Sequence, residues 1–247
     1  MNILQRSDDW HADRCGKVTA SRVKDIDAKP KTGKALNALG LTILTERLTG
    51  VQEETPTTKA MQWGIDQEPY AVAAYENDTG NFVISTGLID HPSIENCGAS
   101  PDGLVGKDGQ IEVKCPTPSV HLNTLLLQEV PSEYLPQITL QLACTRREWC
   151  DFVSYCPLLP EHLKIVVIRV FAKDLDIAGI EMAVIKFNQI IFKAMQGLEF
   201  LKANHELMGL ENGQMEFFNW TDDGKKNITA DFKFGKDVIR SEVTEED

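Results

Sequence analysis

Apolar residues recur every three or four positions over several segments of the chain, the spacing that places them on one face of a helix. Gly50 and Gly80 each follow such a segment, at the place where glycine commonly ends a helix. Thr19 and Ser21 are predicted N-caps of a short helix. The helices predicted in this way cover residues 8–16, 19–25, 35–49, 59–78, 119–127, 133–145 and 173–207.

Elsewhere the period is two, and turn residues separate short apolar segments, a pattern typical of strands. The turn Lys107-Asp108-Gly109 predicts a hairpin between the segments that flank it. The predicted strands cover residues 82–84, 87–89, 103–105, 111–114, 149–155 and 164–171. Helices come first, strands occupy the middle, and helices follow, which predicts an α/β fold with a central mixed β-sheet flanked by helices.

The composition is that of a soluble globular protein, with 42% hydrophobic and 25% charged residues. It excludes collagen, a coiled coil and disorder as descriptions of the whole chain. No run of about 18 apolar residues predicts a membrane helix, and the first ten residues lack the pattern of a secretory signal. The six cysteines include no C-x-x-C pair, so we expect free thiols in a reducing cytoplasm.

The net charge of −12 argues against binding of nucleic acid over the whole surface, because phosphates are neutralised by Lys and Arg. The charge is unevenly distributed, however. Residues 51–130 contain 3 basic and 12 acidic side chains, whereas residues 1–50 contain 9 basic and 6 acidic ones. A locally basic region and an acidic cluster that could hold a metal are therefore both compatible with the composition.

The strongest chemical signal is Ser100-Pro101-Asp102-Gly103 followed by Glu112-Val113-Lys114. Acid-x-Lys occurs four times, but only this instance lies on a predicted strand behind Pro-Asp. Residues two apart on a strand share a face, so Glu112 and Lys114 are expected to emerge together, and the hairpin returns Asp102 beside them. Two close carboxylates favour a bound cation, and Mg²⁺ prefers such oxygen ligands. A solvated surface hairpin is the alternative.

A third acid, Glu68, precedes Pro69 within a predicted helix and has apolar neighbours, which predicts an inward-facing carboxylate. Its alternative is an exposed position on an amphipathic helix. Pro69 and Pro136 lie inside predicted helices, and each predicts a kink or a restart, because proline lacks the N–H that a helix uses.

These blocks occur in an order that resembles the phage lambda exonuclease-like (viral recombinase) family of PD-(D/E)xK nucleases. The resemblance covers residues 8–200 and preserves five blocks. They are Trp10-His11-x-x-Arg14-x-Gly16-x-Val18-Thr19-Ala20-Ser21, Gly64-x-x-x-Glu68, Ser100-Pro101-Asp102-Gly103, Glu112-Val113-Lys114-Cys115-Pro116 and Gln137-x-x-x-Gln141.

The resemblance implies a restriction-endonuclease-like core and Mg²⁺-dependent 5′→3′ digestion of one strand of duplex DNA, with Mn²⁺ as a substitute. The products are 5′-mononucleotides, and a 3′ overhang remains for a single-strand annealing protein. It also implies a homotrimeric ring, a phage or prophage gene and action in the bacterial cytoplasm. No membrane partner is expected.

Site roles are implied in the same way. Asp102, Glu112 and the Val113 carbonyl hold one Mg²⁺, and Glu68 with Asp102 holds a second. Lys114 activates the attacking water, and Ser100 supports the phosphate or the site. Further DNA contacts are assigned to Arg14, Thr19 and Ser21 for the 5′ phosphate, to Met61 for separating the terminal base pair, and to Gln137 and Gln141 for DNA or the site water.

A position in the core is an equal alternative for Met61. For the 5′-phosphate motif, the alternative is a helix cap together with a surface arginine.

Two other functions stay open, and the 5′-phosphate motif argues against a third, a site-specific endonuclease with the same core, because an internal cut needs no 5′-phosphate pocket. Cys15, Cys144, Cys150 and Cys156 could hold an iron–sulfur cluster in a related nuclease, although no close pair supports it. A non-catalytic DNA-end-binding recombination scaffold is the other, although the site acids and Lys114 are all present. We expect a single nuclease domain over residues 1–205 and a C-terminal extension over residues 206–247.

Overall fold

The computed structural model describes residues 5–53, 56–208, 215–218, 228–234 and 237–243. The chain divides into two compact units, of which unit 1 comprises residues 1–31 and 36–195 and unit 2 comprises residues 32–35 and 196–247. The long helix α6 (Ile177–Met208) belongs to both. Among the described helices, none is long and apolar enough to cross a membrane.

Unit 1 contains a five-stranded mixed sheet in the order β2-β5-β6-β7-β8, with β6 in its centre. Strand β6 pairs antiparallel with β5 and parallel with β7, and Glu112 lies opposite Phe152. The predicted α/β fold with a mixed central sheet is confirmed. The strands are β2 (Val83–Ile84), β5 (Gly103–Val105), β6 (Gly109–Lys114), β7 (Trp149–Tyr155) and β8 (Ile165–Phe171).

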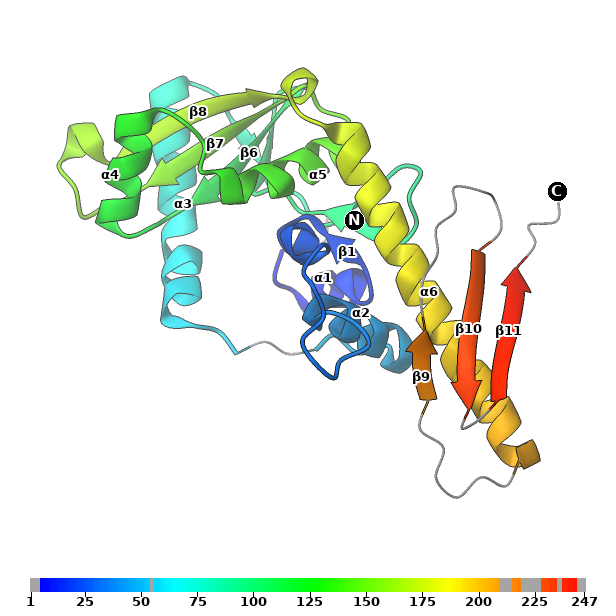
Figure 1. Ribbon diagram of the computed structural model, residues 1–247. Helices are drawn as coiled ribbons and strands as arrows, with labels where there is room; N and C mark the ends of the chain where they lie inside the picture. The colour runs from blue at the N-terminus through cyan, green and yellow to red at the C-terminus, as the bar shows by residue number, and fades with distance from the viewer. Residues whose placement is uncertain (1–4, 54–55, 209–214, 219–227, 235–236, 244–247) are drawn as a thin grey trace. The chain divides into compact units, whose positions relative to one another are not determined.

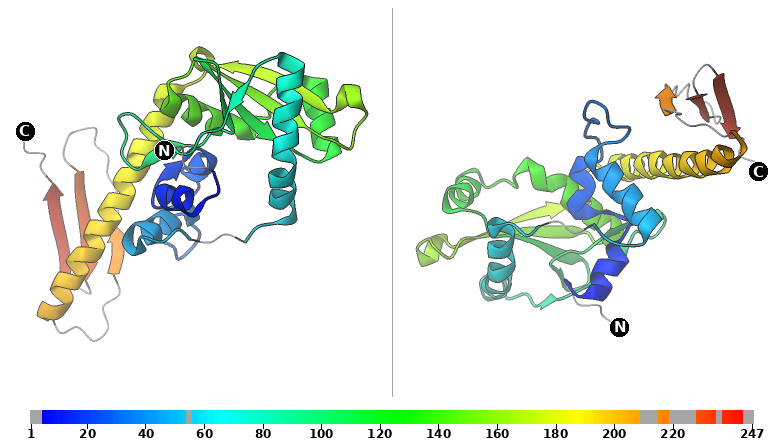
Figure 2. Two further views of the ribbon diagram at one scale, coloured as in Figure 1. Left: turned by 180° about the vertical axis from the view of Figure 1, so that it is seen from behind. Right: turned by 90° about the horizontal axis from the view of Figure 1, so that it is seen from below.

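Helices cover both faces of this sheet. Helix α3 (Lys59–Thr79) lies on one face, and α4 (Pro118–Leu127) and α5 (Leu135–Thr145) lie on the other (Figures 1 and 2). Ile111 and Val113 of β6 pack in one core with residues of α3. The alternation of a strand therefore turns the intervening Glu112 toward α5.

A second core surrounds the N-terminal elements. It joins buried residues of β1, β4, α2, α5 and the first part of α6, so that α5 packs against this core as well as against the sheet. The remaining elements of unit 1 are α1 (Asp8–Arg14), β1 (Val18–Thr19), η1 (Ala20–Asp25), α2 (Ala38–Thr49), β3 (Ile89–Asp90), β4 (Cys97–Ala99) and the 3₁₀ turns η2 (Ser132–Tyr134), η3 (Glu161–Leu163) and η4 (Ala172–Asp174).

Two helices begin later than predicted. Helix α2 starts at Ala38 rather than at residue 35, because the side chain of Asn37 caps it by accepting a hydrogen bond from the Gly40 amide at 2.7 Å. Helix α6 starts at Ile177 rather than at residue 173, because the chain first forms the 3₁₀ turn η4.

The predictions made from the two prolines are wrong in part. Helix α3 runs through Pro69 without a restart. Pro136 lies in the first turn of α5, since that helix begins at Leu135, and the first turn is where a missing N–H costs nothing.

The sequence did not predict β1 and β4, which pair in parallel with Val18 opposite Cys97 in the sheet β1-β4-β3. Nor did it predict the antiparallel sheet β11-β10-β9 of unit 2. Strands β1 and β4, with two and three residues, are too short to show a period. The strands of unit 2 are β9 (Met215–Phe218), β10 (Ile228–Phe234) and β11 (Asp237–Val243).

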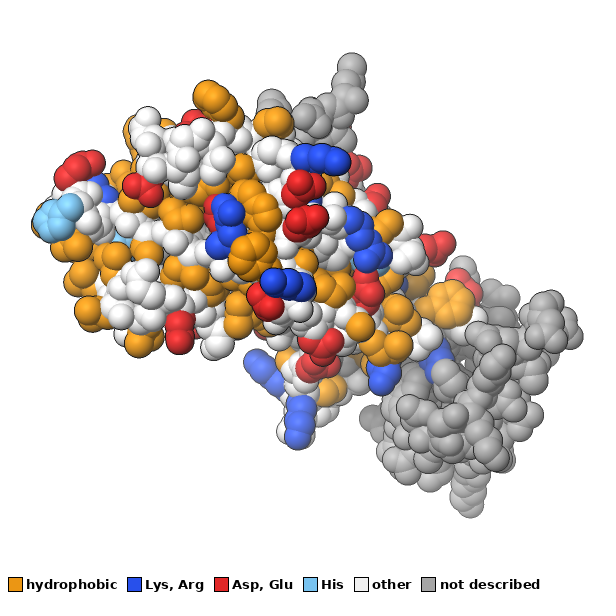
Figure 3. All heavy atoms as spheres, turned by 90° about the horizontal axis from the view of Figure 1, so that it is seen from above, with side chains coloured by type: hydrophobic (Ala, Val, Ile, Leu, Met, Phe, Trp, Pro, Cys, Tyr) orange, Lys and Arg blue, Asp and Glu red, His pale blue; other side chains and the backbone are white. Residues whose placement is uncertain are grey.

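Charged side chains of both signs are interspersed on the face of the molecule shown in Figure 3, with apolar side chains between them. The excess of acid is therefore not displayed there as one continuous acidic surface.

Candidate active site

The hairpin of β5 and β6 brings Asp102 to the end of β6, as predicted. The Asp102 amide donates to the Ile111 carbonyl at 3.2 Å, and the Asp102 carboxylate accepts from the Val113 amide at 2.7 Å. Gly103 is opposite Ile111 in the register. Asp102 is thus fixed beside Glu112 by two backbone hydrogen bonds.

The Glu112 side chain is almost completely buried and is surrounded by donors. Its Oε1 accepts from the Lys114 ammonium and from Nε2 of Gln137 at 2.6 Å, and its Oε2 accepts from Nε2 of Gln141 at 2.6 Å. The sequence predicted that Glu112 and Lys114 share a face, which the contact between them confirms. It did not predict that Glu112 is the partner of both glutamines.

The close charges of this cluster shift the pKa values of Asp102 and Lys114. Burial, together with the neighbouring Glu112 carboxylate, raises the pKa of Asp102 well above its usual range. Burial opposes the charge of Lys114, but Glu112 and Asp102 outweigh it and raise the pKa of its ammonium. Lys114 is therefore held protonated, while Asp102 retains a proton more readily than a solvated carboxyl does.

Glu68 projects from α3 and pairs with Arg6, a residue that no sequence pattern singled out. The Glu68 side chain is 24% exposed, so neither a fully inward nor a fully solvated position describes it. Its charge adds to the effects that raise the pKa of Asp102, which places Glu68 within electrostatic range of that carboxyl.

Arg14 lies at the end of α1, buried against Trp10 with its guanidinium carbon 4.2 Å from the ring centre. Its Nη2 donates to Thr19 Oγ1 at 3.2 Å and to Ser21 Oγ at 3.0 Å. The buried Nε has no hydrogen-bond partner among the described residues. Burial, followed by the nearby charge of Arg22, lowers the pKa of the Arg14 guanidinium to about 10.

The prediction that Thr19 and Ser21 cap the following helix with their hydroxyls is wrong, and Ser21 lies inside η1 rather than at its N-cap. Thr19 occupies the N-cap position of η1 but makes no side-chain cap hydrogen bond. Its hydroxyl instead contacts Arg14 and Ser21. The reading of Arg14 as a surface arginine is likewise wrong, because its side chain is buried.

One groove of about 460 Å³ joins the carboxylate cluster to the Arg14 pocket. Trp10 connects the two, since its indole N–H donates to Ser100 Oγ at 3.0 Å, two residues before Asp102. Every predicted site residue except the fully buried Thr19 lines the groove. Those residues are Arg14, Ser21, Met61, Glu68, Ser100, Asp102, Glu112, Val113, Lys114, Gln137 and Gln141.

Met61 is 48% exposed near the start of α3, so the alternative of a core methionine is wrong. The groove also contains Tyr134, whose ring centre lies 5.2 Å from the Lys114 ammonium. Sequence reasoning missed this tyrosine and also Arg6. Neither Tyr134 nor Arg6 belongs to a sequence motif that would distinguish it from a surface residue.

The carboxylate cluster suits a hard dication. Mg²⁺ is commonly bound by one or two carboxylates with water completing its shell, and Asp102 and Glu112 supply such a pair. A dication there would also relieve the repulsion that raises the pKa of Asp102. Among the described residues, no three His, Cys, Asp or Glu side chains are close enough to hold a metal ion by themselves.

The same finding weighs against an iron–sulfur cluster, because the structure does not gather the four candidate cysteines. Cys15 donates to the Glu46 carbonyl at 3.6 Å, Cys144 contacts Cys97, and Cys150 and Cys156 are buried.

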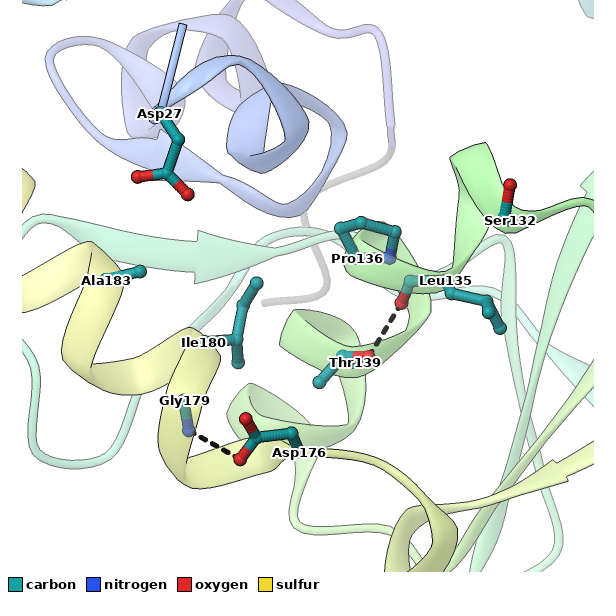
Figure 4. Close-up of a pocket in the computed structure, with 9 residues that line it drawn as sticks. All are labelled: Asp27, Ser132, Leu135, Pro136, Thr139, Asp176, Gly179, Ile180 and Ala183. Atoms are coloured by element: carbon teal, nitrogen blue, oxygen red, sulfur yellow. Dashed lines mark hydrogen bonds between the residues drawn. The ribbon is translucent and has the colours of Figure 1, made fainter.

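A second hollow, of about 440 Å³, lies between the starts of α5 and α6 (Figure 4). Two of its polar side chains make hydrogen bonds to the backbone of α5 and of α6, respectively. Thr139 Oγ1 donates to the Leu135 carbonyl at 2.7 Å, and Asp176 accepts from the Gly179 amide at 2.8 Å. The residues of α5 that line this hollow are different from the two glutamines of α5 that contact Glu112, so the hollow is separate from the carboxylate cluster.

The family model described as the YqaJ-like viral recombinase domain matches residues 9–148, more than half of the chain. The chain belongs to the YqaJ-like viral recombinase family. All of the site residues predicted from the sequence lie within the matched region of this family member. The family resemblance stated from the sequence is thereby confirmed.

Solved structures agree with the family. This YqaJ-like chain is 41% identical to LHK-Exo in its complex with dAMP, with a TM-score of 0.74, covering 80% of this chain and 99% of that one. It is 42% identical to a second structure of LHK-Exo, an alkaline exonuclease from Laribacter hongkongensis, with a TM-score of 0.73 and the same coverage.

A phage-related exonuclease from Haemophilus somnus 129PT is 14% identical, with a TM-score of 0.54, and covers 74% of this chain and 96% of that one. That likeness concerns the fold alone. The comparison with curated proteins finds no match.

Proposed function

We propose that the chain is a Mg²⁺-dependent 5′→3′ exonuclease that digests one strand of duplex DNA. The observation that carries this proposal is the single groove in which a carboxylate–lysine cluster lies beside a buried arginine pocket. Membership of the YqaJ-like family and the identity with an alkaline exonuclease support the nuclease chemistry.

We assign one Mg²⁺ to Asp102, Glu112 and the Val113 carbonyl, and a second to Glu68 and Asp102, with Mn²⁺ as a substitute. When bound, the metal polarises the scissile phosphate and lowers the pKa of a bound water. Arg6 pairs with Oε2 of Glu68, so a second ion would bind Oε1 of that carboxylate or displace Arg6.

Lys114 acts as a donor. Its ammonium contacts Glu112 and lines the groove, where it orients the attacking water and stabilises negative charge that develops on the phosphate. Glu112 holds the ammonium in place, and Ser100, tied to Trp10, supports the loop that carries Asp102.

Arg14 reads the 5′ phosphate. A guanidinium that lines the groove and is flanked by two hydroxyls can donate charge-assisted hydrogen bonds to a phosphate. The exposed Met61 on the wall of the same groove separates the terminal base pair, and Gln137 contributes to the DNA side of the site.

As the family resemblance implies, the products are 5′-mononucleotides, and a 3′ overhang remains. A terminal 5′ phosphate at Arg14 with the next phosphodiester at the carboxylates of the same groove would give these products. LHK-Exo was crystallised with dAMP, a molecule of that product class. In keeping with the family resemblance, a single-strand annealing protein receives the overhang, and the enzyme is a phage-type homotrimeric ring in the bacterial cytoplasm.

The deciding experiment compares a linear duplex bearing 5′ phosphates with the same DNA as a closed circle, in Mg²⁺. We expect mononucleotides from the linear DNA and none from the circle. Cleavage of the circle would contradict an exonuclease, and binding to ends without digestion would indicate a non-catalytic scaffold.

Arg14→Ala tests the phosphate pocket. We expect digestion of 5′-phosphorylated ends to fall by about tenfold to 100-fold, because charged hydrogen bonds to the phosphate are lost, and digestion of 5′-hydroxyl ends to change little. Lys24→Ala, which removes an exposed cation from η1, is the matched control. An equal loss on both kinds of end would rule out the 5′-phosphate pocket.

A further inference from the structure

A row of polar side chains fills the interface between β6 and α5. On β6, Gln110 and Glu112 are two residues apart and share a face. On α5, Gln141 and Thr145 are four residues apart and share a face. Gln110, Gln141 and Glu112 are at most 1% exposed, so their polar atoms must be satisfied within the protein.

These side chains form one continuous chain of hydrogen bonds that ends on the Glu112 carboxylate. The Arg147 amide donates to Thr145 Oγ1 at 3.4 Å, and Thr145 Oγ1 donates to Gln110 Oε1 at 2.8 Å. Nε2 of Gln110 donates to Gln141 Oε1 at 3.4 Å, and Nε2 of Gln141 donates to Glu112 Oε2 at 2.6 Å. We call this sequence of four contacts the Thr145 relay.

The direction of the relay is fixed at the Glu112 end. An ionised carboxylate can only accept, so Gln141 turns its NH₂ toward Glu112 and its Oε1 toward Gln110. Gln110 must then donate to Gln141 and accept from the Thr145 hydroxyl, which can also accept from the Arg147 amide. Reversal of either glutamine amide would oppose two donors or two acceptors in a buried place, which is costly.

We propose that Gln110 and Thr145 are positioning residues, which hold the Gln141 amide with its NH₂ toward Glu112 and so fix the carboxylate that receives the metal. Neither residue lines the groove, and each acts through its neighbour. This inference rests on the proposed metal-dependent nuclease function.

The relay gives Gln141 a role that the other two donors to Glu112 do not fill. Lys114 and Gln137 both bond to Oε1 of Glu112, whereas Gln141 is the described donor to Oε2. Without the relay, the buried Oε1 of Gln141 would lose its partner, and the amide would rotate to find another. The second oxygen of the carboxylate would then lose its donor and its orientation.

Thr145→Val tests the relay far from the groove, because it replaces the hydroxyl by a methyl group of similar shape. Thr145→Ser keeps the hydroxyl and is expected to behave like the unmodified protein. Thr139→Val is the matched control: Thr139 lies on α5 as well, but its hydroxyl donates to the helix's own Leu135 carbonyl.

The measurement is the dissociation constant for Mn²⁺ without DNA, read from the electron paramagnetic resonance of free Mn²⁺ on the full chain. We expect Thr145→Val to weaken Mn²⁺ binding by about threefold to tenfold, below the roughly 10–100-fold effect of groups that contact a ligand directly. Thr145→Ser and Thr139→Val should leave it unchanged.

A double-mutant cycle separates the relay from a general loss of packing. Gln110→Leu should weaken Mn²⁺ binding as well, and Thr145→Val should add nothing once Gln110 is replaced, because the hydroxyl acts only through that amide. Additive losses, or an unchanged constant in Thr145→Val, would overturn the relay. If the unmodified chain digests DNA and binds Mn²⁺, such a result concerns the relay alone. If it does neither, the proposed function itself is wrong, and the relay with it.

Discussion

Lys114 carries the most specific chemical assignment among the residues of the groove. Replacement by Ala removes the ammonium that contacts Glu112, and we expect DNA digestion at saturating Mg²⁺ to fall by about 100-fold or more. Lys107→Ala removes a fully solvated lysine from the turn of the same hairpin and should leave digestion unchanged. Circular dichroism checks that the fold persists. Near-normal digestion by Lys114→Ala would refute its role.

Asp102 gives the site a dependence on pH with a definite sign. Because burial and the Glu112 carboxylate raise the pKa of Asp102, its carboxyl holds a proton at pH values where a solvated one is ionised. A metal binds the ionised form, so its affinity should fall as the pH falls, and binding should release a proton. Calorimetry in two buffers of different ionisation enthalpy measures that release, which Asp102→Asn should abolish. A pH-independent affinity would contradict this.

At the scale of residues, the sequence predicts partners along one element better than partners across elements. Strand alternation placed Glu112 with Lys114, and the hairpin placed Asp102, because both depend on local geometry. The contact of Gln141 with Glu112 spans 29 residues and depends on how α5 packs. Gln110 and Thr145 do show the strand and helix spacings, but no sequence rule says that these two faces meet.

Single elements were predicted closely, since most helices and strands of unit 1 have at least six residues and a clear period. The errors concern ends and very short pieces. A cap such as Asn37, or the 3₁₀ turn η4, moves a helix start by a few residues without changing the apolar period. The pairing of β1 with β4 joins residues nearly eighty positions apart, which a local pattern cannot show.

Gly109 is the position at which the start of β6 depends most on the absence of a side chain. A Cβ there would lie 2.0 Å from the Trp149 ring, which Arg169 covers at 3.6 Å. We therefore expect Gly109→Ala to lower the free energy of unfolding by about 1–3 kcal/mol through overpacking. Gly64→Ala has open space around its Cβ within α3 and should stabilise the chain by about 1 kcal/mol. Thermal unfolding of both variants measures the difference, and equal melting temperatures would contradict it.

For the molecule as a whole, the position of the groove predicts which part is dispensable. All residues that line it belong to unit 1. A chain that ends at residue 205 should therefore keep Mg²⁺-dependent digestion of linear DNA, within about twofold, because surface changes remote from a site commonly cost little. Loss of digestion by a truncated chain that still unfolds cooperatively on heating would assign residues 206–247 a part in activity. The domain boundary at 205 stays a prediction.

The charge of −12 has its explanation at this scale too. Several of the acids in residues 51–130 line the groove as Glu68, Asp102 and Glu112, while the pocket at Arg14 lies in the basic N-terminal fifth. The net charge alone predicted poor DNA binding, whereas the distribution of charge along the chain predicted a local DNA-binding site.

The central place of β6 also decides the order in which the site comes apart. Strand β6 is hydrogen-bonded to β5 on one side and to β7 on the other, so we expect exchange of its amide hydrogens to require opening of the whole sheet. Helix α1 and residues 5–7 lie at the periphery of unit 1 and can open alone. At low concentrations of denaturant, the protein would therefore lose binding of the 5′ phosphate first. Asp102 and Glu112 would stay together until the sheet itself unfolds.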